Sequence, residues 1–203
     1  VTGVQTCALP ILETYFARKS IKDNKPKRAE SIYRRLMDEF HTSNSRNIKA
    51  IQAVERATGN TSFSAAAAVD ATLENECNYA NLAVPTLLLG LLLQREERYD
   101  DARTVFEGFT HVLDEDGGDH ACSCCARVLQ AHALFEMKQN QPVRAVELII
   151  RAVRMDGNLR PVLRWKQFRD AMVEYRAHQR RMRIEEEIER RQLEQQPSFV
   201  ASV

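Results

Sequence analysis

Turn-forming residues are scarce in this sequence, which has 7 glycines and 6 prolines among its 203 residues. Sandwiches and barrels of short strands need many tight turns, and glycine and proline supply most of these. Their low number therefore argues against an all-β fold. Arginine, glutamate, alanine and leucine dominate instead, and these residues favour helices.

Long apolar runs and an excess of one charge are also absent. The longest apolar run, Leu82 to Leu93, has about a dozen residues, whereas a membrane-spanning helix needs roughly 20. We therefore interpret this run as a buried core helix. The formal net charge is +1, so binding to nucleic acid or to an anionic membrane would need a local charged patch.

The five cysteines do not follow the pattern of a disulfide framework. Cys122, Cys124 and Cys125 fall within four positions, and Cys7 and Cys77 are distant from them in sequence. Cysteines this close along a chain rarely bond to one another. We therefore expect a reducing compartment, either the cytoplasm or the interior of an organelle.

Residues 1–11 read VTGVQTCALPI, a string that resembles the translated read-through of a sequencing-library adapter. The alternative is a genuine disordered terminus. In the first case Cys7 leaves the cysteine count, and we expect the natural N-terminus to be missing. The lack of a targeting peptide then carries no information about localisation.

Apolar residues spaced three and four apart predict an all-α chain. Pro26, Pro142 and Pro161 suit the first turn of a helix, where the missing N–H costs nothing. Polar residues 42–47 and 60–64 are predicted as loops, and 114–119 as an acidic glycine loop. The predicted helices span about residues 12–23, 26–41, 46–58, 65–78, 82–98, 102–113, 122–138, 142–156 and 161–196.

Three of the predicted helix pairs share the spacing of their small residues. In the second helix of each pair, an alanine is followed four residues later by an aromatic or branched residue: Ala29 with Tyr33, Ala102 with Phe106, and Ala145 with Ile149. Twelve residues before each of these alanines is another small residue: Ala17, Gly90 and Ala133. This pattern resembles the tetratricopeptide repeat, in which small residues let paired helices pack closely.

The resemblance covers about residues 12–157 and extends to the half-a-tetratricopeptide-repeat family. The alanines are 73 and then 43 residues apart, against about 34 per repeat. The acidic glycine loop accounts for the second excess, and the first leaves room for a degenerate pair formed by helices 46–58 and 65–78. The family's tryptophan and its terminal proline motif are missing.

The resemblance implies a right-handed α-solenoid of three to four helix pairs. Four segments are then expected: an adapter artefact at 1–11, a repeat domain at 12–160, a capping or extended helix at 161–196, and a disordered tail at 197–203. Stacked pairs leave a groove lined by their first helices. The implied function is a protein–protein interaction scaffold, an adaptor or assembly factor that binds a peptide or helix.

The helix phase implied by the repeat places Val84, Leu87, Leu88 and Leu91 on the groove side. Arg127 is the only basic residue expected beside this apolar face. A clamp for acidic peptide tails, which needs several basic or polar residues, is therefore disfavoured. An apolar face needs a cover, which is either a partner helix, a second copy of the chain in a homo-oligomer, or the chain's own 161–175 helix.

The cysteine cluster offers a weak metal signal. His120, Cys122 and Cys125, with Asp119, have the residue types that zinc prefers, and Cys122 and Cys125 share a helix face. No second pair with metal-ligand spacing follows. The alternative is small residues packed at a helix start, and we expect no metal and no other cofactor.

The stretch from Arg176 to Arg183 has four arginines, one histidine and no acidic residue. Its residues Arg176, Arg180, Arg181 and Arg183 are candidates for RNA contact. The alternative is a solvated helix in which Arg181 pairs with Glu185 and Arg183 with Glu187.

No sequence motif indicates catalysis. There is no phosphate-binding loop, no dinucleotide-binding glycine pattern and no GxSxG motif. The five histidines are scattered, and only His120 is close in sequence to candidate nucleophiles. We therefore expect a protein that is not an enzyme.

Overall fold

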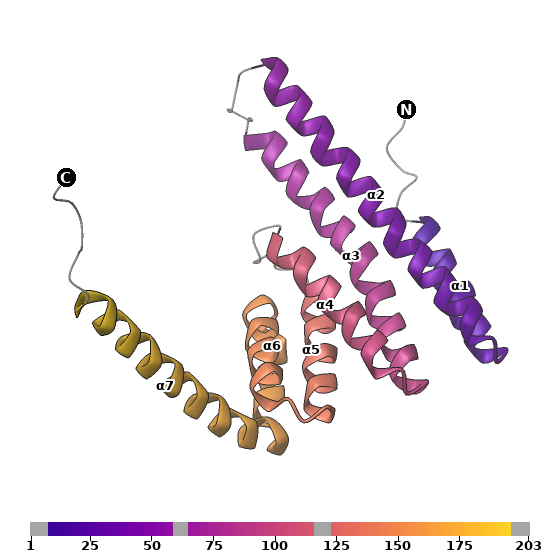
Figure 1. The fold of residues 1–203 in the computed structure, drawn as a ribbon. Coiled ribbons are helices and arrows are strands. Elements are labelled where there is room, and N and C mark those ends of the chain that lie inside the picture. The colour runs from indigo at the N-terminus through magenta and orange to yellow at the C-terminus, as the bar shows by residue number, and fades with distance from the viewer. Residues whose placement is uncertain (1–7, 59–64, 116–122, 196–203) are drawn as a thin grey trace, which may run out of the picture.

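A computed structural model describes residues 8–58, 65–115 and 123–195 (Figure 1). All regular structure in these ranges is helical, which confirms the predicted all-α class, and none of these helices is both long and apolar enough to cross a membrane. The expectations for residues 1–7 and 197–203 lie outside the described ranges. In chain order the helices are α1 (Ala8–Lys22), α2 (Pro26–Thr58), α3 (Ala65–Arg95), α4 (Tyr99–Glu115), α5 (Ser123–Lys138), α6 (Pro142–Met155), the 3₁₀ helix η1 (Gly157–Arg164) and α7 (Lys166–Gln195).

Helices α2 and α3 are longer than the sequence predicts. α2 continues through residues 42–47, so the predicted loop there is wrong. These residues include no glycine or proline, and polar residues extend an existing helix at little cost because only nucleation is expensive. α3 likewise joins the predicted 65–78 and 82–98 helices. The predicted degenerate pair is therefore wrong, since its two helices are extensions of α2 and α3.

The connection between α6 and α7 also differs from the prediction. Pro161 lies inside η1, and the long helix starts at Lys166 instead. The Asp156 side chain accepts a hydrogen bond of 2.9 Å from the backbone N–H of Asn158, which caps η1. Trp165 has extended backbone (φ −63°, ψ 141°) and separates η1 from α7.

The helices form three hairpins in a row (Figure 1). α1 packs on α2, α3 on α4, and α5 on α6. α3 also contacts α2 and α5, which joins the hairpins to one another, and α7 packs on α6 at the end of the row. The handedness of this row stays a prediction of the repeat resemblance.

The three hairpins share one turn geometry. Asn24, Glu97 and Asn140 each have left-handed backbone, with φ of 56°, 61° and 58°. The next N–H in each turn donates to the carbonyl five residues earlier: Lys25 to Ser20 (2.8 Å), Arg98 to Leu93 (3.0 Å) and Gln141 to Glu136 (2.9 Å). This combination is a Schellman helix end. The turns recur at the same spacings, 73 and 43 residues, as the alanines.

The small residues that define the repeat are all buried at helix contacts: Ala17, Ala29, Gly90, Ala102, Ala133 and Ala145. Gly90 shows why size matters at these positions. A Cβ atom on Gly90 would lie 2.3 Å from Cζ of Phe106, so glycine alone lets α3 approach α4 this closely. Phe106, like Tyr33 and Ile149, is fully buried.

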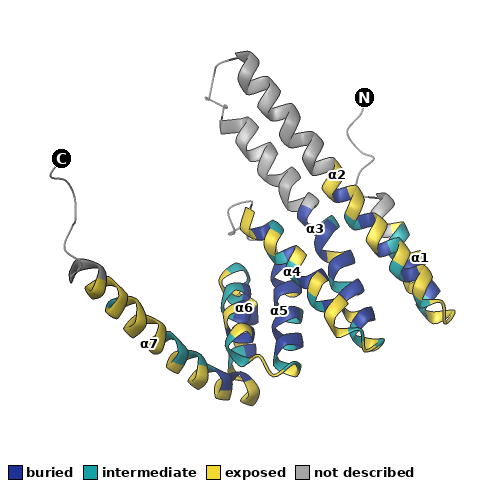
Figure 2. Cartoon of the chain, in the orientation of Figure 1, coloured by how far each residue is buried: buried dark blue, intermediate teal, exposed yellow. Residues whose placement is uncertain are grey.

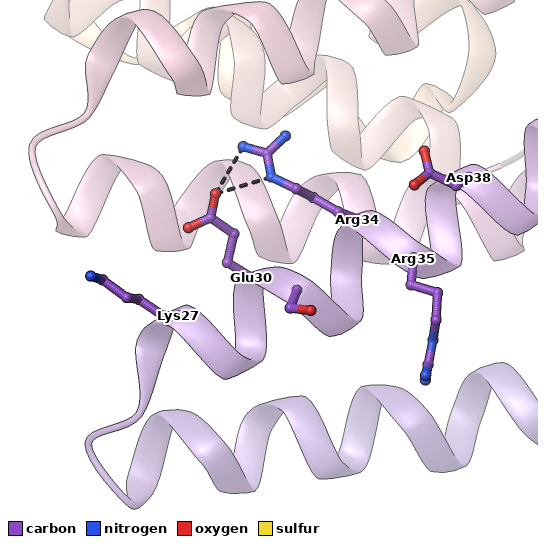
Figure 3. A pocket seen from close by; sticks show the side chains of 6 residues that line it. Lys27, Glu30, Arg34, Arg35 and Asp38 are labelled. Atoms are coloured by element: carbon purple, nitrogen blue, oxygen red, sulfur yellow. Dashed lines mark hydrogen bonds and ion pairs between the residues drawn. The ribbon is translucent and has the colours of Figure 1, made fainter.

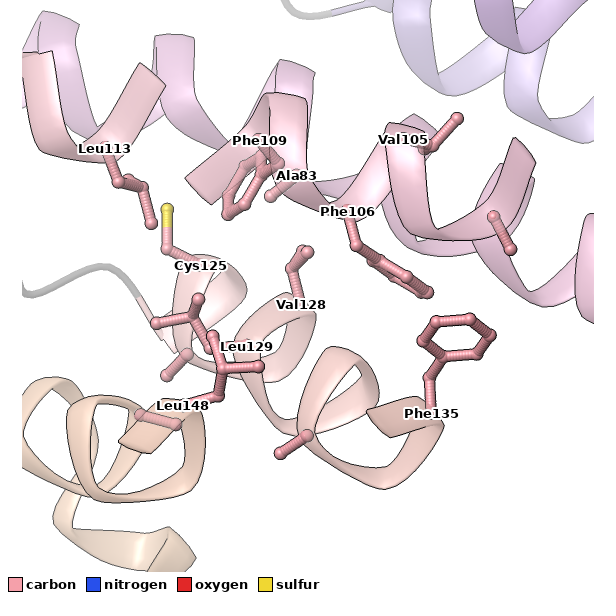
Figure 4. Close-up of a cluster of buried hydrophobic side chains, with 14 of the residues drawn as sticks. Ala83, Val105, Phe106, Phe109, Leu113, Cys125, Val128, Leu129, Phe135 and Leu148 are labelled. Carbon is pink, nitrogen blue, oxygen red and sulfur yellow. The ribbon is translucent and has the colours of Figure 1, made fainter. Parts of the chain in front are cut away.

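A cluster of fully buried side chains joins α4 to α5. Phe106 and Phe109 of α4 meet Val128 and Phe135 of α5 there (Figure 4). Burial decreases sharply along α7, whose distal part is mostly exposed (Figure 2). The molecule therefore has a packed body and a projecting helix.

Candidate functional site

The predicted groove residues of α3 lie on one helix face. Val84, Leu87, Leu88 and Leu91 are spaced 3, 1 and 3 apart, which places them on the same side of the helix. Leu91 is 48% exposed and Val84 is 37% exposed, whereas Leu87 and Leu88 are half-buried against the core. The face is apolar and partly open to solvent.

A pocket of about 490 Å³ opens beside this face. It brings together three of the predicted groove residues, Val84, Leu87 and Arg127. Leu91 lies about one helical turn beyond Leu87 on α3. The complete lining is Ala83, Val84 and Leu87 from α3, Ser123, Cys124 and Arg127 from α5, and Asp156 and Asn158 after α6.

Arg127 provides a positive charge at the rim of the pocket. Its guanidinium donates only a long hydrogen bond of 3.5 Å to Gln130. No carboxylate of the described side chains lies within ion-pair distance of it. Asp156 lines the same pocket, but its carboxylate already accepts the Asn158 N–H. Arg127 is thus available to a negative group of a ligand.

The chain's own C-terminal helix does not cover the α3 face, so the 161–175 alternative is wrong. α7 packs on α6 and η1 instead. Phe168 and Ala171 are buried in that contact, and Met172 and Tyr175 are half-buried. The face around Leu91 remains open because the apolar seam of α7 matches α6.

The structure separates the members of the cysteine cluster. Cys125 is fully buried among apolar side chains that include Leu113 and Leu129 (Figure 4). Cys124 is half-buried and lines the pocket. His120 and Cys122 lie outside the described residues. Among the side chains that the structure does describe, no three His, Cys, Asp or Glu residues converge as metal ligands would.

The four candidate RNA-contacting arginines, Arg176, Arg180, Arg181 and Arg183, are exposed on α7. The predicted pairs of Arg181 with Glu185 and of Arg183 with Glu187 do not form. Glu187 pairs with Arg190 and Arg191 instead. In the described chain, none of the four arginines has an ion-pair partner.

A charged cluster around a buried glutamate, which the sequence did not predict, joins α4, α5 and α6. Glu136 is 1% exposed and accepts two hydrogen bonds of 3.0 Å from Arg103. The Arg103 guanidinium also lies 5.6 Å from the Phe135 ring centroid. His132 Nε2 is 3.3 Å from Glu136 Oε1, and Arg144 Nε is 4.0 Å from it.

Burial lowers the pKa of His132, partly opposed by the negative charge of Glu136. The imidazole stacks on Phe106 with ring centroids 5.2 Å apart. No solvent reaches His132 or Glu136, so the cluster holds helices together and offers no place for a substrate. Its sequence signal was a histidine and a glutamate four residues apart within an otherwise apolar helix face.

A second hollow, of about 450 Å³, lies over the charged surface of α2 (Figure 3). Glu30 is its centre and accepts hydrogen bonds from Arg34 (2.8 Å) and Arg98 (2.7 Å). The bond from Arg98 lowers the pKa of Glu30. Arg35 pairs with Glu13. Glu30, Arg34 and Arg35 are thus paired within the protein, and no apolar residue lines the hollow.

Comparisons with known proteins do not decide between these sites. No family model matches the chain, and neither the curated proteins nor the solved structures include a match. The functional argument therefore depends on the geometry described above.

Proposed function

We propose that this protein is a tetratricopeptide-like interaction scaffold that binds an amphipathic segment of a partner protein along α3. The observation that carries the proposal is the open face of Val84, Leu87, Leu88 and Leu91 beside the pocket. Three hairpins with one turn geometry and buried small residues support the repeat resemblance. Grooves of such repeats bind peptides and helices.

The lining of the pocket supports a partner segment that is mainly apolar. Its floor is apolar where Val84 and Leu87 line it, and Leu91 extends the apolar surface by one turn. A partner helix would fill it with apolar side chains spaced three and four residues apart. An acidic residue at the edge of that segment would pair with Arg127, to which no carboxylate of the described side chains is bound.

The proposal can be tested with a displayed library of random peptides selected on the purified protein. We expect selected peptides to combine an apolar stripe with an acidic residue. Leu91→Asp should abolish their binding without loss of stability, because Leu91 is half exposed. Leu87→Asp is a less clean test, since Leu87 also packs on the core. Arg127→Glu should lower the affinity most for the selected peptides that contain the acidic residue.

Tyr99→Asp is the matched control, because it places the same charge on another exposed apolar residue, at the start of α4. Its binding should equal that of the wild type. The proposal fails if selected peptides bind the Leu91→Asp and Tyr99→Asp proteins equally well, or if their sequences have no common apolar spacing.

A further inference from the structure

The distal half of α7 leaves the body of the protein. The helix has 30 residues, but its contacts with α6 and η1 involve its first part, where Phe168 and Ala171 are buried. None of the described side chains after Tyr175 belongs to the core or packs against it. Residues 176–195 project as a single helix (Figure 1). Most helical stability in proteins comes from tertiary packing, and within the described chain this segment has no packing partner.

An apolar stripe runs along the projecting helix. Val173 is 68% exposed, Ile184 is 59% exposed and Ile188 is 50% exposed, and Ala177 is exposed between them. At about 100° per residue, these four positions fall within about 60° of one another. The same arithmetic places Phe168, Ala171 and Tyr175 on the opposite side, which faces α6. The stripe is therefore free while the helix is docked on the body.

Two blocks of opposite charge follow one another along the projecting helix. Arg176, Arg180, Arg181 and Arg183 come first, and Glu185, Glu186, Glu187 and Glu189 follow. The described chain provides no ion-pair partner for the arginines, and of these glutamates only Glu187 has one, on its own helix. Each block lacks a counterpart of the opposite charge from another helix.

We propose that a second copy of this chain covers the stripe, with the two α7 helices antiparallel. An antiparallel copy sets the basic block of each helix beside the acidic block of the other, whereas a parallel copy would set like charges together. With Ala177 opposite Ile188 of the second copy, Arg181 lies near its Glu185 and Arg180 near its Glu187. The two bodies then lie toward opposite ends of the paired helices, each of which is about 45 Å long.

A nucleic acid fits this surface less well. Phosphate binding needs a surface of one sign, and the acidic block begins two residues after Arg183. The exposed isoleucines would also remain uncovered. The complementary partner is a protein surface that has both charge signs and an apolar stripe. A second copy of this chain provides such a surface. This inference is independent of the function proposed for α3.

Sedimentation equilibrium of the full chain tests the proposal. The wild type should be a dimer at low salt. Ile184→Ser with Ile188→Ser should be monomeric with an unchanged thermal unfolding temperature of the body. Met182→Ser removes an exposed apolar side chain from the other side of the same helix, and should remain dimeric. A wild type that stays monomeric at millimolar concentration, or a double variant that stays dimeric, overturns the proposal.

Charge reversal tests the antiparallel contact. Arg180→Glu with Arg181→Glu should be monomeric, and so should Glu185→Arg with Glu187→Arg, because each variant then opposes like charges. Mixing the two variants should restore a dimer that contains one of each. No heterodimer in the mixture counts against the proposal. A wild type that is monomeric and shifts RNA in a gel at low salt, with the shift lost in the Arg180→Glu, Arg181→Glu variant, also counts against the proposal. The surface would then bind nucleic acid. Leu91→Asp should stay dimeric, which separates this test from that of the α3 face.

Discussion

The packed body and the distal half of α7 both contain arginine–glutamate pairs, but the pairs differ in burial and in what they connect. In the body, Arg103 on α4 binds Glu136 on α5 where no solvent reaches the carboxylate. On α7, Glu187 pairs with Arg190 and Arg191 of its own exposed helix. A buried pair between helices fixes their register, because an unpaired buried charge is expensive. An exposed pair on one helix adds little, so its charges remain available to another molecule.

The largest expected effect comes from adding one methyl group to the body. Gly90→Ala should destabilise the protein by about 3 kcal/mol, because the new Cβ meets the Phe106 ring. Gly108→Ala is the control, since nothing lies near its Cβ position on α4. Replacing that glycine should stabilise the protein by about 0.5–1 kcal/mol. Chemical denaturation measures both, and equal effects would contradict the tight contact of α3 with α4.

Removing one glutamate from each region compares the two directly. Glu136→Ala should cost about 2 kcal/mol, because Arg103 loses its partner and His132 its neighbour. Glu187→Ala should change the free energy of unfolding by at most about 0.5 kcal/mol. The same denaturation measurement applies. A small effect of Glu136→Ala would show that water replaces the carboxylate without loss.

Acid should weaken the body through His132. Burial lowers its pKa in the folded state from the ordinary 6.5, so the unfolded chain binds a proton first as the pH falls. The stability that neutral His132 contributes is present above about pH 6.5 and is lost as the pH falls toward the folded pKa. His132→Gln should therefore flatten the dependence of melting temperature on pH between about 7 and about 5. An unchanged slope would assign the acid sensitivity to another group.

The smallest effect should follow from removing the projecting helix. A chain that ends at Arg176 keeps Phe168, Ala171 and Tyr175 on α6, so the free energy of unfolding should change by less than about 0.5 kcal/mol. A large loss, measured on monomeric protein, would show that residues 177–203 stabilise the body. The truncated chain should also fail to dimerise.

The sequence predicted the hairpins because their signals are local. Ala29, Ala102 and Ala145 mark the contact positions, and Pro26 and Pro142 give the correct first residues of α2 and α6. The prediction was wrong at residues 42–47, where polar composition was taken as the end of a helix, and at Pro161, which was taken as the start of one. Neither signal sets a helix boundary by itself. Continuation depends on neighbouring turns, and the start of α7 depends on the Asp156 cap and the extended Trp165.

The shared helix face of the candidate site follows from spacing, but its use as a binding groove stays a prediction. Val84 and Leu87 are three residues apart on α3, and the fold adds Arg127 from α5 to the pocket that they line. Whether α7 covers that face could not be predicted from the sequence. The answer depends on whether the apolar side of α7 packs on α6 or on α3. The Glu136 cluster was missed because its partner Arg103 is 33 residues away in sequence, and only the fold brings them together.

The shared turn also explains why the repeat spacing is irregular. Asn24, Glu97 and Asn140 hold the same end of every hairpin in one geometry, so the hairpins are aligned at that end. The longer helices therefore extend past the others at the opposite end, here called the ragged edge. The added turns of α2 and α3 lie toward that edge. Insertions there lengthen helices without altering how hairpins meet. The ragged edge is thus where this architecture can gain new sequence while its contacts stay unchanged.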